Sequence, residues 1–202
     1  MKKTDFKIAV FAGDGIGPEI MKEALKVLKV IAGKKNIAFH IHEGLVGGCA
    51  YDQCGIPLPD SSLKLALRCD AVLLGAVGGP QWESLAYNVR PERALLGLRG
   101  SLGIYANLRP VVAFEELLGA SPLKKSIARG IDIMIVRELT GDVYFGQPRG
   151  VQKGDDGKRS GVNTMVYHED EIRRIAVSAF EIARRRKKRL TSVDKANILE
   201  TM

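Results

Sequence analysis

The sequence predicts an α/β fold with a mixed, largely parallel sheet. The amino-terminal segment has the pattern of a strand, a glycine-rich turn and a helix, and apolar strand patterns then alternate with helical ones. A short apolar run from Ile131 to Val136 is typical of a strand covered on both faces. Strands that alternate with helices favour parallel pairing, because each crossover returns the chain to the same edge of the sheet.

Length and composition limit the class of protein. The 202 residues suffice for one large α/β domain or two small lobes. The hydrophobic fraction of 46% and the charged fraction of 27% are ordinary for a soluble protein. No apolar run approaches the ~18 residues of a membrane span. The first ten residues, MKKTDFKIAV, lead directly into a strand pattern and contain no signal segment. We therefore expect a cytoplasmic protein.

The cysteines and the basic residues leave the kind of partner open. Cys49, Cys54 and Cys69 lack metal-ligand spacing, so we expect reduced, structural thiols. The net charge is +8, and the run from Arg184 to Arg189 supplies most of the excess. Either this run is a solvated helix end, or it is a patch that binds nucleic acid. An enzyme with anionic ligands would carry the same sign of charge.

The first predicted unit is a strand over Phe6 to Ala12 and a helix over Glu19 to Ile31. Between them lies GDGIGP, whose Pro18 suits the first helical turn. This turn is similar to a dinucleotide-binding fingerprint, but it lacks the third glycine at the required distance. A standard Rossmann fold is therefore not predicted.

The next segments continue the alternation. We predict strands over Ile37 to Ile41 and Ala71 to Leu74, and a helix over Ser61 to Arg68. Gly44 to Pro59 is predicted to be a connection with about one helical turn. The loop from Gly79 to Glu92 is long, and the glycines before it allow close approach of a ligand to the backbone. It is the best local candidate for a cofactor site.

Three arginines lie near the ends of predicted elements. Arg99 ends a helix predicted over Glu92 to Arg99. Arg109 lies in a strand predicted over Ile104 to Val112, and Arg137 lies at the end of the strand that starts at Ile131. If they converge, the charge-assisted bonds, worth ~1.5 to 3 kcal/mol each, could select a dicarboxylate. The alternative is three unrelated surface arginines.

The segment after the strand at Ile131 carries further reactive groups. Arg137 and Glu138 lie where that strand would end, and Tyr144 follows the Thr140-Gly141 turn. Ligands of open α/β sheets bind outside the carboxyl ends of the strands. A guanidinium for a carboxylate and a phenol for proton transfer are therefore predicted at one place. The alternative is a surface pair of Arg137 and Glu138 beside a packed tyrosine.

The carboxyl-terminal part is predicted to form an arm, a helix and a short strand. A hairpin tip over Gln147 to Gly161, within an arm over residues 143–167, could clasp a second subunit. His168 to Lys188 is amphipathic, with acidic residues in its first turn. Leu190 to Val193 is predicted to be a brief strand.

Six separated motifs run along the chain: GDGIGPE (13–19), LLGAVGGP (73–80), RPERALLGLR (90–99), NLRP (107–110), VRELTGDVYFGQPRG (136–150) and SVDKAN (192–197). Together they resemble the family of isopropylmalate, isocitrate and tartrate dehydrogenases. The resemblance implies a two-lobe fold in which residues 1–103 form the first part of a discontinuous cofactor-binding lobe. Residues 104–202 would form the second lobe with the dimerisation arm.

The resemblance also implies roles for single residues. Tyr144 would donate a proton after decarboxylation, and Lys195 would take the hydroxyl proton, within the partner subunit's site. Arg99, Arg109 and Arg137 would bind the malate carboxylates, and Leu95 and Leu96 would meet the isopropyl group. The implied NAD-binding residues are Ile16, Gly79, Pro80, Gln81, Trp82, Glu83, Ser84, Leu85, Ala86, Tyr87, Asn88, Val89, Arg90, Pro91 and Glu92.

The implied reaction is the NAD-dependent oxidative decarboxylation of 3-isopropylmalate to 4-methyl-2-oxopentanoate in leucine biosynthesis, by a homodimer with Mg²⁺ or Mn²⁺. Family members are longer, and their metal-ligating aspartates would lie beyond Met202. We therefore expect no metal site within these residues and little independent catalysis. Asp142 stands where many relatives have glycine. The alternatives are a tartrate- or isocitrate-type dehydrogenase and a non-catalytic basic binding fragment.

Overall fold

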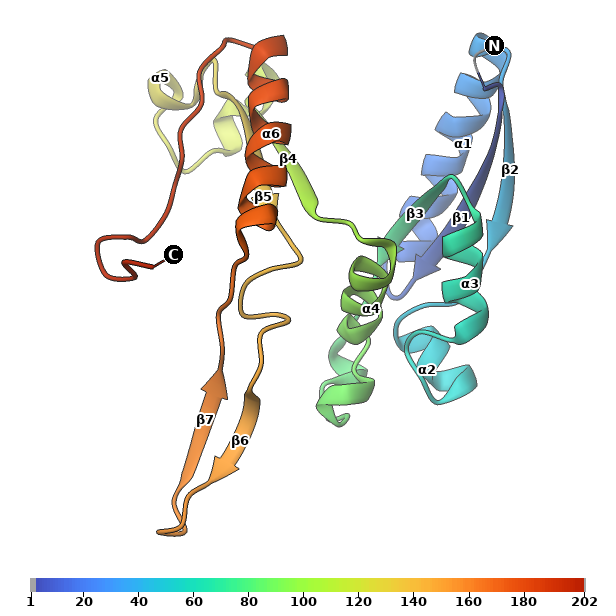
Figure 1. Ribbon diagram of the computed structural model, residues 1–202. Coiled ribbons are helices and arrows are strands. Elements are labelled where there is room, and N and C mark those ends of the chain that lie inside the picture. Colours follow the sequence, from blue (N-terminus) through green and yellow to red (C-terminus); the bar gives the residue numbers. More distant parts are fainter. Residues whose placement is uncertain (1–2, 202) are drawn as a thin grey trace. The chain divides into compact units, whose positions relative to one another are not determined.

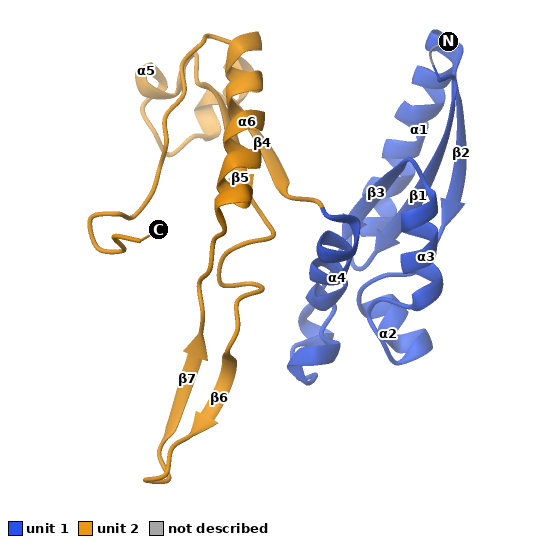
Figure 2. Cartoon of the chain, viewed as in Figure 1, with its two compact units in different colours: residues 1–103 blue, residues 104–202 orange. Residues whose placement is uncertain are grey.

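The computed structural model describes residues 3–201 and divides the chain into two compact units, Met1–Gly103 and Ile104–Met202 (Figure 2). The first unit consists of β1 (Asp5–Gly13), α1 (Gly17–Lys35), β2 (Ala38–Glu43), α2 (Gly48–Cys54), α3 (Asp60–Arg68), β3 (Ala71–Ala76), the 3-10 turns η1 (Pro80–Trp82) and η2 (Tyr87–Val89), and α4 (Glu92–Leu102). The second unit consists of β4 (Ala106–Val112), the 3-10 turn η3 (Glu115–Ala120), α5 (Lys125–Ala128), β5 (Asp132–Glu138), β6 (Arg149–Lys153), β7 (Arg159–Asn163) and α6 (Glu169–Arg185).

The first unit is built on a parallel sheet in the order β2-β1-β3 (Figure 1). Successive residues of β1 point to opposite faces, so that Ala9 and Phe11 join one hydrophobic cluster and Ile8 and Val10 the other. Such a central strand is buried on both sides, which explains its nearly continuous apolar sequence. The predicted parallel sheet is confirmed for these three strands.

Helix α1 connects β1 to β2 and begins as its sequence predicts. Pro18 lies in the first turn, where its missing N–H costs no hydrogen bond. The helix ends at Asn36 in the left-handed conformation, with φ 52°. Its outer face exposes Val27 and Val30, which are 58% and 56% accessible. The first unit therefore presents apolar surface on this helix.

Helix α2 is longer than the sequence pattern indicated. We expected about one helical turn between Gly44 and Pro59, and the structure has seven helical residues there. The helix ends at Gly55 with φ 73°, a conformation that glycine adopts without steric cost. The glycines that suggested a loop thus lie at the ends of a helix.

In the second unit, β4 and β5 pair antiparallel in a separate two-stranded sheet. This differs from the expectation of one largely parallel sheet. The expectation that the strand at Ile131 to Val136 is covered on both faces is also wrong for the described residues. Ile133 and Ile135 are 52% and 46% exposed, because α6 covers only the opposite face of this short sheet.

The predicted hairpin is confirmed as β6 and β7, which pair from Arg149 with Asn163 to Lys153 with Arg159. Figure 1 shows it projecting from the second unit as a two-stranded arm. The predicted helix after it is confirmed as α6. The strand predicted over Leu190 to Val193 is wrong. That segment has no neighbouring strand within residues 3–201, and Val193 is 90% exposed.

None of the described helices combines the length and the apolarity that crossing a bilayer requires.

Candidate functional site

The carboxyl ends of β1 and β3 meet at a buried carboxylate, Asp14. Its oxygens accept hydrogen bonds from the backbone N–H groups of Gly48 (2.7 Å), Cys49 (2.7 Å) and Gly78 (2.8 Å). Asp14 therefore ties the start of α2 and the turn after β3 to the turn after β1. A side chain at Gly47 would meet the Asp14 carboxylate at 2.4 Å, so this approach requires glycine. No role for Asp14 was predicted from the sequence, although its place between two glycines after a strand was the available signal.

The loop after β3 is fixed to the rest of the first unit by Trp82. The indole is 8% exposed and donates from Nε1 to Asp52 of α2 at 3.0 Å. Arg90 donates to the backbone carbonyls of Glu83 (2.8 Å) and Leu85 (3.0 Å). These contacts hold the loop in one conformation, as a preformed ligand site requires.

The remaining groups of the predicted cofactor positions differ in accessibility. Ile16, in the turn between β1 and α1, is 55% exposed. Gly78, which precedes the loop, has φ 100°, which requires glycine and brings bare backbone to the edge of the sheet. The side chains of Trp82 and Pro91 are buried within the unit, whereas Gly79, Leu85 and Val89 are half-buried. The exposed positions are Pro80, Gln81, Glu83, Ser84, Ala86, Tyr87, Asn88, Arg90 and Glu92.

Arg99 lies on α4 together with Leu95 and Leu96. Residues three and four apart are neighbours on a helix surface, so both leucines adjoin Arg99. Ala94 and Leu98 are buried in the core and thereby fix the rotation of the helix. The first unit thus carries one cation beside two half-buried aliphatic side chains.

Arg109 and Arg137 lie on one face of the β4–β5 sheet. Arg137 of β5 is paired with Asn107 of β4, and Arg109 lies two residues after Asn107 on β4. Directly opposed residues of an antiparallel pair share a face, which places both guanidiniums on the face opposite α6. Arg109 donates from Nε to the Asn107 side chain. The second unit therefore brings two of the three arginines together.

Tyr144 joins this group. The Arg137 guanidinium lies over the Tyr144 ring, 5.7 Å from its centroid, and Tyr144 is 40% exposed. Its phenol is thus accessible next to a cation. A carboxylate held by Arg137 would lie within reach of a proton donor.

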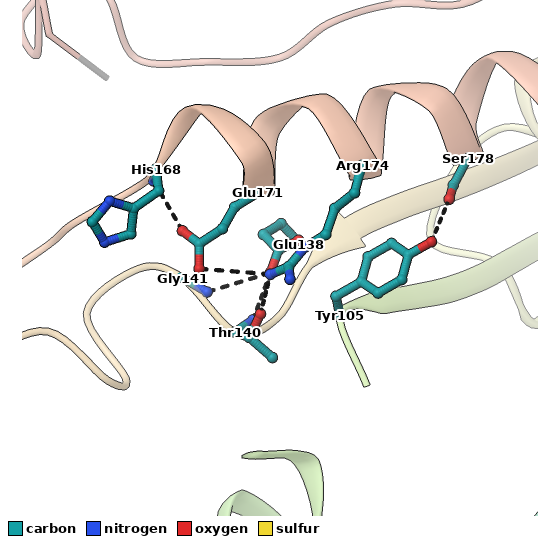
Figure 3. A network of polar contacts seen from close by, with 8 residues as sticks. All are labelled: Tyr105, Glu138, Thr140, Gly141, His168, Glu171, Arg174 and Ser178. Atoms are coloured by element: carbon teal, nitrogen blue, oxygen red, sulfur yellow. Dashed lines mark hydrogen bonds and ion pairs between the residues drawn. The ribbon is translucent and has the colours of Figure 1, made fainter. Parts of the chain in front are cut away.

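The residue after Arg137 is held by a network of polar contacts that Figure 3 shows. The Glu138 side chain is 7% exposed and accepts hydrogen bonds from the Thr140 N–H (2.8 Å) and from Nη2 of Arg174 (2.9 Å). Burial by itself raises the pKa of the Glu138 carboxyl, but these hydrogen bonds outweigh burial and hold that pKa below its usual value. Arg174 also lies over the Tyr105 ring at 5.0 Å, and Tyr105 hydrogen-bonds to Ser178 at 2.9 Å (Figure 3). The network fastens α6 to the residue that precedes β4 and to the end of β5.

The alternative prediction, a surface pair of Arg137 and Glu138, is therefore wrong. Neighbouring residues of a strand point to opposite faces, so Glu138 turns to α6 while Arg137 turns away. The ion-pair partner of Arg137 is instead Asp142, with 3.7 Å between Nη2 and Oδ2.

Lys195 is exposed in the segment after α6. Within residues 3–201 its side chain makes no hydrogen bond or ion pair with Arg109, Arg137 or Tyr144. In the basic run before it, Arg186 is bound to Asp132 at 2.6 Å. Lys187 of the same run also pairs with Asp132, at 3.8 Å, so two cations of the run tie the segment after α6 to the start of β5.

The described part of the chain contains no group of three or more His, Cys, Asp or Glu side chains arranged to hold a metal ion. The residues present therefore do not provide a site for the divalent cation that the resemblance implies. The three cysteines are free thiols.

Comparison with known proteins gives consistent matches over the whole chain. The isocitrate/isopropylmalate dehydrogenase family matches residues 7–202. The 3-isopropylmalate dehydrogenase of Methylococcus capsulatus is 57% identical over 194 residues, which are 96% of this chain and 54% of that protein. That of Aquifex aeolicus is 53% identical over 99% of this chain and 54% of its own length. The chain spans about half the length of the curated relatives it matches.

Solved structures give the same match. The crystal structure of isocitrate dehydrogenase from Methylococcus capsulatus superimposes with a TM-score of 0.78 at 30% identity, covering 97% of this chain and 53% of that chain. A beta-decarboxylating dehydrogenase from Thermococcus kodakarensis, in its apo form, gives a TM-score of 0.66 at 32% identity, covering 96% and 50%.

Proposed function

Because the chain belongs to the isocitrate/isopropylmalate dehydrogenase family, we propose that it is part of a cytoplasmic, NAD-dependent 3-isopropylmalate dehydrogenase of leucine biosynthesis. The observation that carries the proposal is the identity of 53 to 57% with proteins of that name over nearly the entire chain. Leu95 and Leu96 support the substrate, because two aliphatic side chains beside Arg99 suit an isopropyl group next to a carboxylate.

In the proposed reaction Arg99, Arg109 and Arg137 bind the two carboxylates of 3-isopropylmalate. Arg109 and Arg137 share a face, so they could hold one carboxylate from two sides. Bound NAD⁺ would accept the hydride from C2 of the substrate. Lys195 of a partner subunit would take the hydroxyl proton, since it has no contact with the group around Arg137 among the described residues of its own chain. The domain roles follow: Met1–Gly103 would bind the cofactor and Ile104–Met202 would carry the dimer arm.

After loss of CO₂ from C3, the carbanion requires a proton. Tyr144 is the proposed donor, because its phenol is accessible and lies beside the Arg137 guanidinium. The product is 4-methyl-2-oxopentanoate. No step is assigned to the divalent cation, since the described residues form no site for it.

The cofactor would lie against the loop from Gly79 to Glu92 and Ile16. The support is the position of this loop at the carboxyl ends of β1 and β3, where open α/β sheets bind ligands. Trp82 and Arg90 would act through the loop rather than by direct contact, since the indole is buried and Arg90 binds backbone carbonyls.

The proposal is tested with the protein produced from the complete reading frame that contains these residues. We expect NADH formation from 3-isopropylmalate with Mg²⁺ or Mn²⁺, and much slower turnover of tartrate and isocitrate. An Arg137→Ala variant should lose most of the activity, whereas Arg129→Ala, which removes an exposed partner of Glu115, should retain it. Good turnover of tartrate or isocitrate without turnover of 3-isopropylmalate would reject the substrate assignment.

A further inference from the structure

Asp142 is a carboxylate fixed within the group that carries the proposed substrate-binding cation. Its Oδ2 lies 3.7 Å from Nη2 of Arg137, and its side chain is 15% exposed. The same guanidinium lies over the Tyr144 ring. A carboxylate therefore stands next to the guanidinium that also contacts Tyr144.

The surroundings of Asp142 hold this charge in place independently of Arg137. Its Oδ1 accepts a hydrogen bond from the N–H of Val143 at 2.6 Å, and its own N–H donates to the carbonyl of Val166 at 2.9 Å. Burial, and after it the Asp142 charge, raises the pKa of the neighbouring Tyr167 phenol. Because these contacts do not depend on Arg137, the carboxylate would remain where it is when a ligand approaches.

The backbone conformation at Asp142 is also uncommon for a residue other than glycine. Its φ is 72°, a left-handed conformation that glycine adopts freely and that Asp and Asn tolerate better than most residues. An aspartate here is therefore strained relative to glycine. The position thus carries a charge that the turn itself does not need.

We propose that Asp142 is a specificity-determining residue of the site around Arg137, and that it weakens the binding of ligands in proportion to their negative charge. This inference rests on the proposed function, in which Arg137 binds a substrate carboxylate. A fixed carboxylate repels every further anion that the guanidinium attracts, and the repulsion grows with each added charge. The residue would thereby favour dicarboxylates over tricarboxylates.

The test is a series of ligands of increasing charge: lactate, malate and citrate. Their dissociation constants are measured by calorimetry on the full-length protein and its variants. Asp142→Asn removes the charge but keeps a side chain that tolerates the left-handed backbone. We expect it to tighten binding by about twofold for lactate, and by about tenfold for citrate, with malate between.

Two further variants separate charge from backbone effects. Asp142→Gly removes both the charge and the strain, and it should show the same graded gain. Asp132→Asn removes a carboxylate that is paired with Arg186 at the far end of β5, and it should leave all three constants unchanged. An equal gain for the three ligands, no gain, or a gain in the Gly variant alone would overturn the inference.

Failure of the proposed function gives a different result. If 3-isopropylmalate is not turned over but the graded gain in affinity appears, the dehydrogenase assignment is rejected and the charge selection by Asp142 is supported. If turnover occurs without the graded gain, the inference alone falls. If the unaltered protein neither turns over the substrate nor binds any of the three ligands, both are rejected.

Discussion

At the scale of single residues, the buried carboxylates Asp14 and Glu138 determine how the candidate site is held. Each accepts several hydrogen bonds from groups that lie far away in the sequence or in the adjoining turn. A buried carboxylate is stable only when such donors surround it. Neither residue would touch the substrate in the proposed mechanism, so their effect is to position the turns that do.

Glu138→Gln should lower the free energy of unfolding by about 1 to 3 kcal/mol, because Arg174 would lose its charged partner. The pH dependence gives a second readout. The pKa of Glu138 is lower in the folded state than in the unfolded state. Its contribution to folding stability is therefore present above the ordinary carboxyl pKa, and it is lost as the pH falls through the folded-state pKa. Urea unfolding at several pH values should therefore show a smaller acid-induced loss of stability in the variant.

Glu169→Gln is the matched control, since the Glu169 side chain is 85% exposed in its pair with Arg173 on the same helix. Exposed pairs contribute little, so its unfolding should resemble that of the unaltered protein. Equal stability of both variants across the pH range would contradict the structural role of Glu138.

At the scale of elements, local patterns predicted most helices and strands. The spacing in α1, α4 and α6 and the apolar runs of β1 and β3 depend on near neighbours, which the sequence displays directly. The length of α2 was missed because its buried partners, among them Trp82, are distant in the sequence. Pairing is also non-local, so neither the antiparallel partner of β5 nor its uncovered face could be deduced from its composition.

The same distinction applies to the site. The turn glycines and Tyr144 were predictable because they lie within short motifs. The Asp14 contacts, the orientation of Glu138 toward α6 and the pairing of Arg137 with Asp142 are products of folding. The proposed roles of the arginines come from the family resemblance, because their spacing alone left these roles open.

The β6–β7 arm yields a prediction at this scale. Val151 is 65% exposed on a two-stranded ribbon, and such ribbons are marginally stable unless another surface covers them. We propose that the arm pairs with a second copy. Replacing residues 151–161 by an Asn-Gly turn, which keeps the first two residue pairs, should convert the full-length protein from dimer to monomer in sedimentation experiments.

A substitution at the tip of the arm serves as its control. Asp155→Ser changes the loop between the strands without removing a pair, so the sedimentation coefficient should stay that of the dimer. A shortened arm that leaves the protein dimeric would exclude the arm as the main contact between subunits.

At the scale of the whole chain, the two units have separate sheets and carry different residues of the proposed site. The first contains the cofactor loop, Arg99 and the two leucines, and the second contains Arg109, Arg137 and Tyr144. Kinetic tests on the protein from the complete reading frame include the proposed groups of both units.

The anchoring of Trp82 has a practical consequence, because this is the only tryptophan among the 202 residues. Its ultraviolet emission should respond when NADH occupies the neighbouring loop, and in denaturant titrations this indole should report on unfolding of the first unit. A substrate-competent protein whose indole spectrum ignores saturating NADH would place the dinucleotide elsewhere. The molecule thus contains its own optical label for the cofactor step.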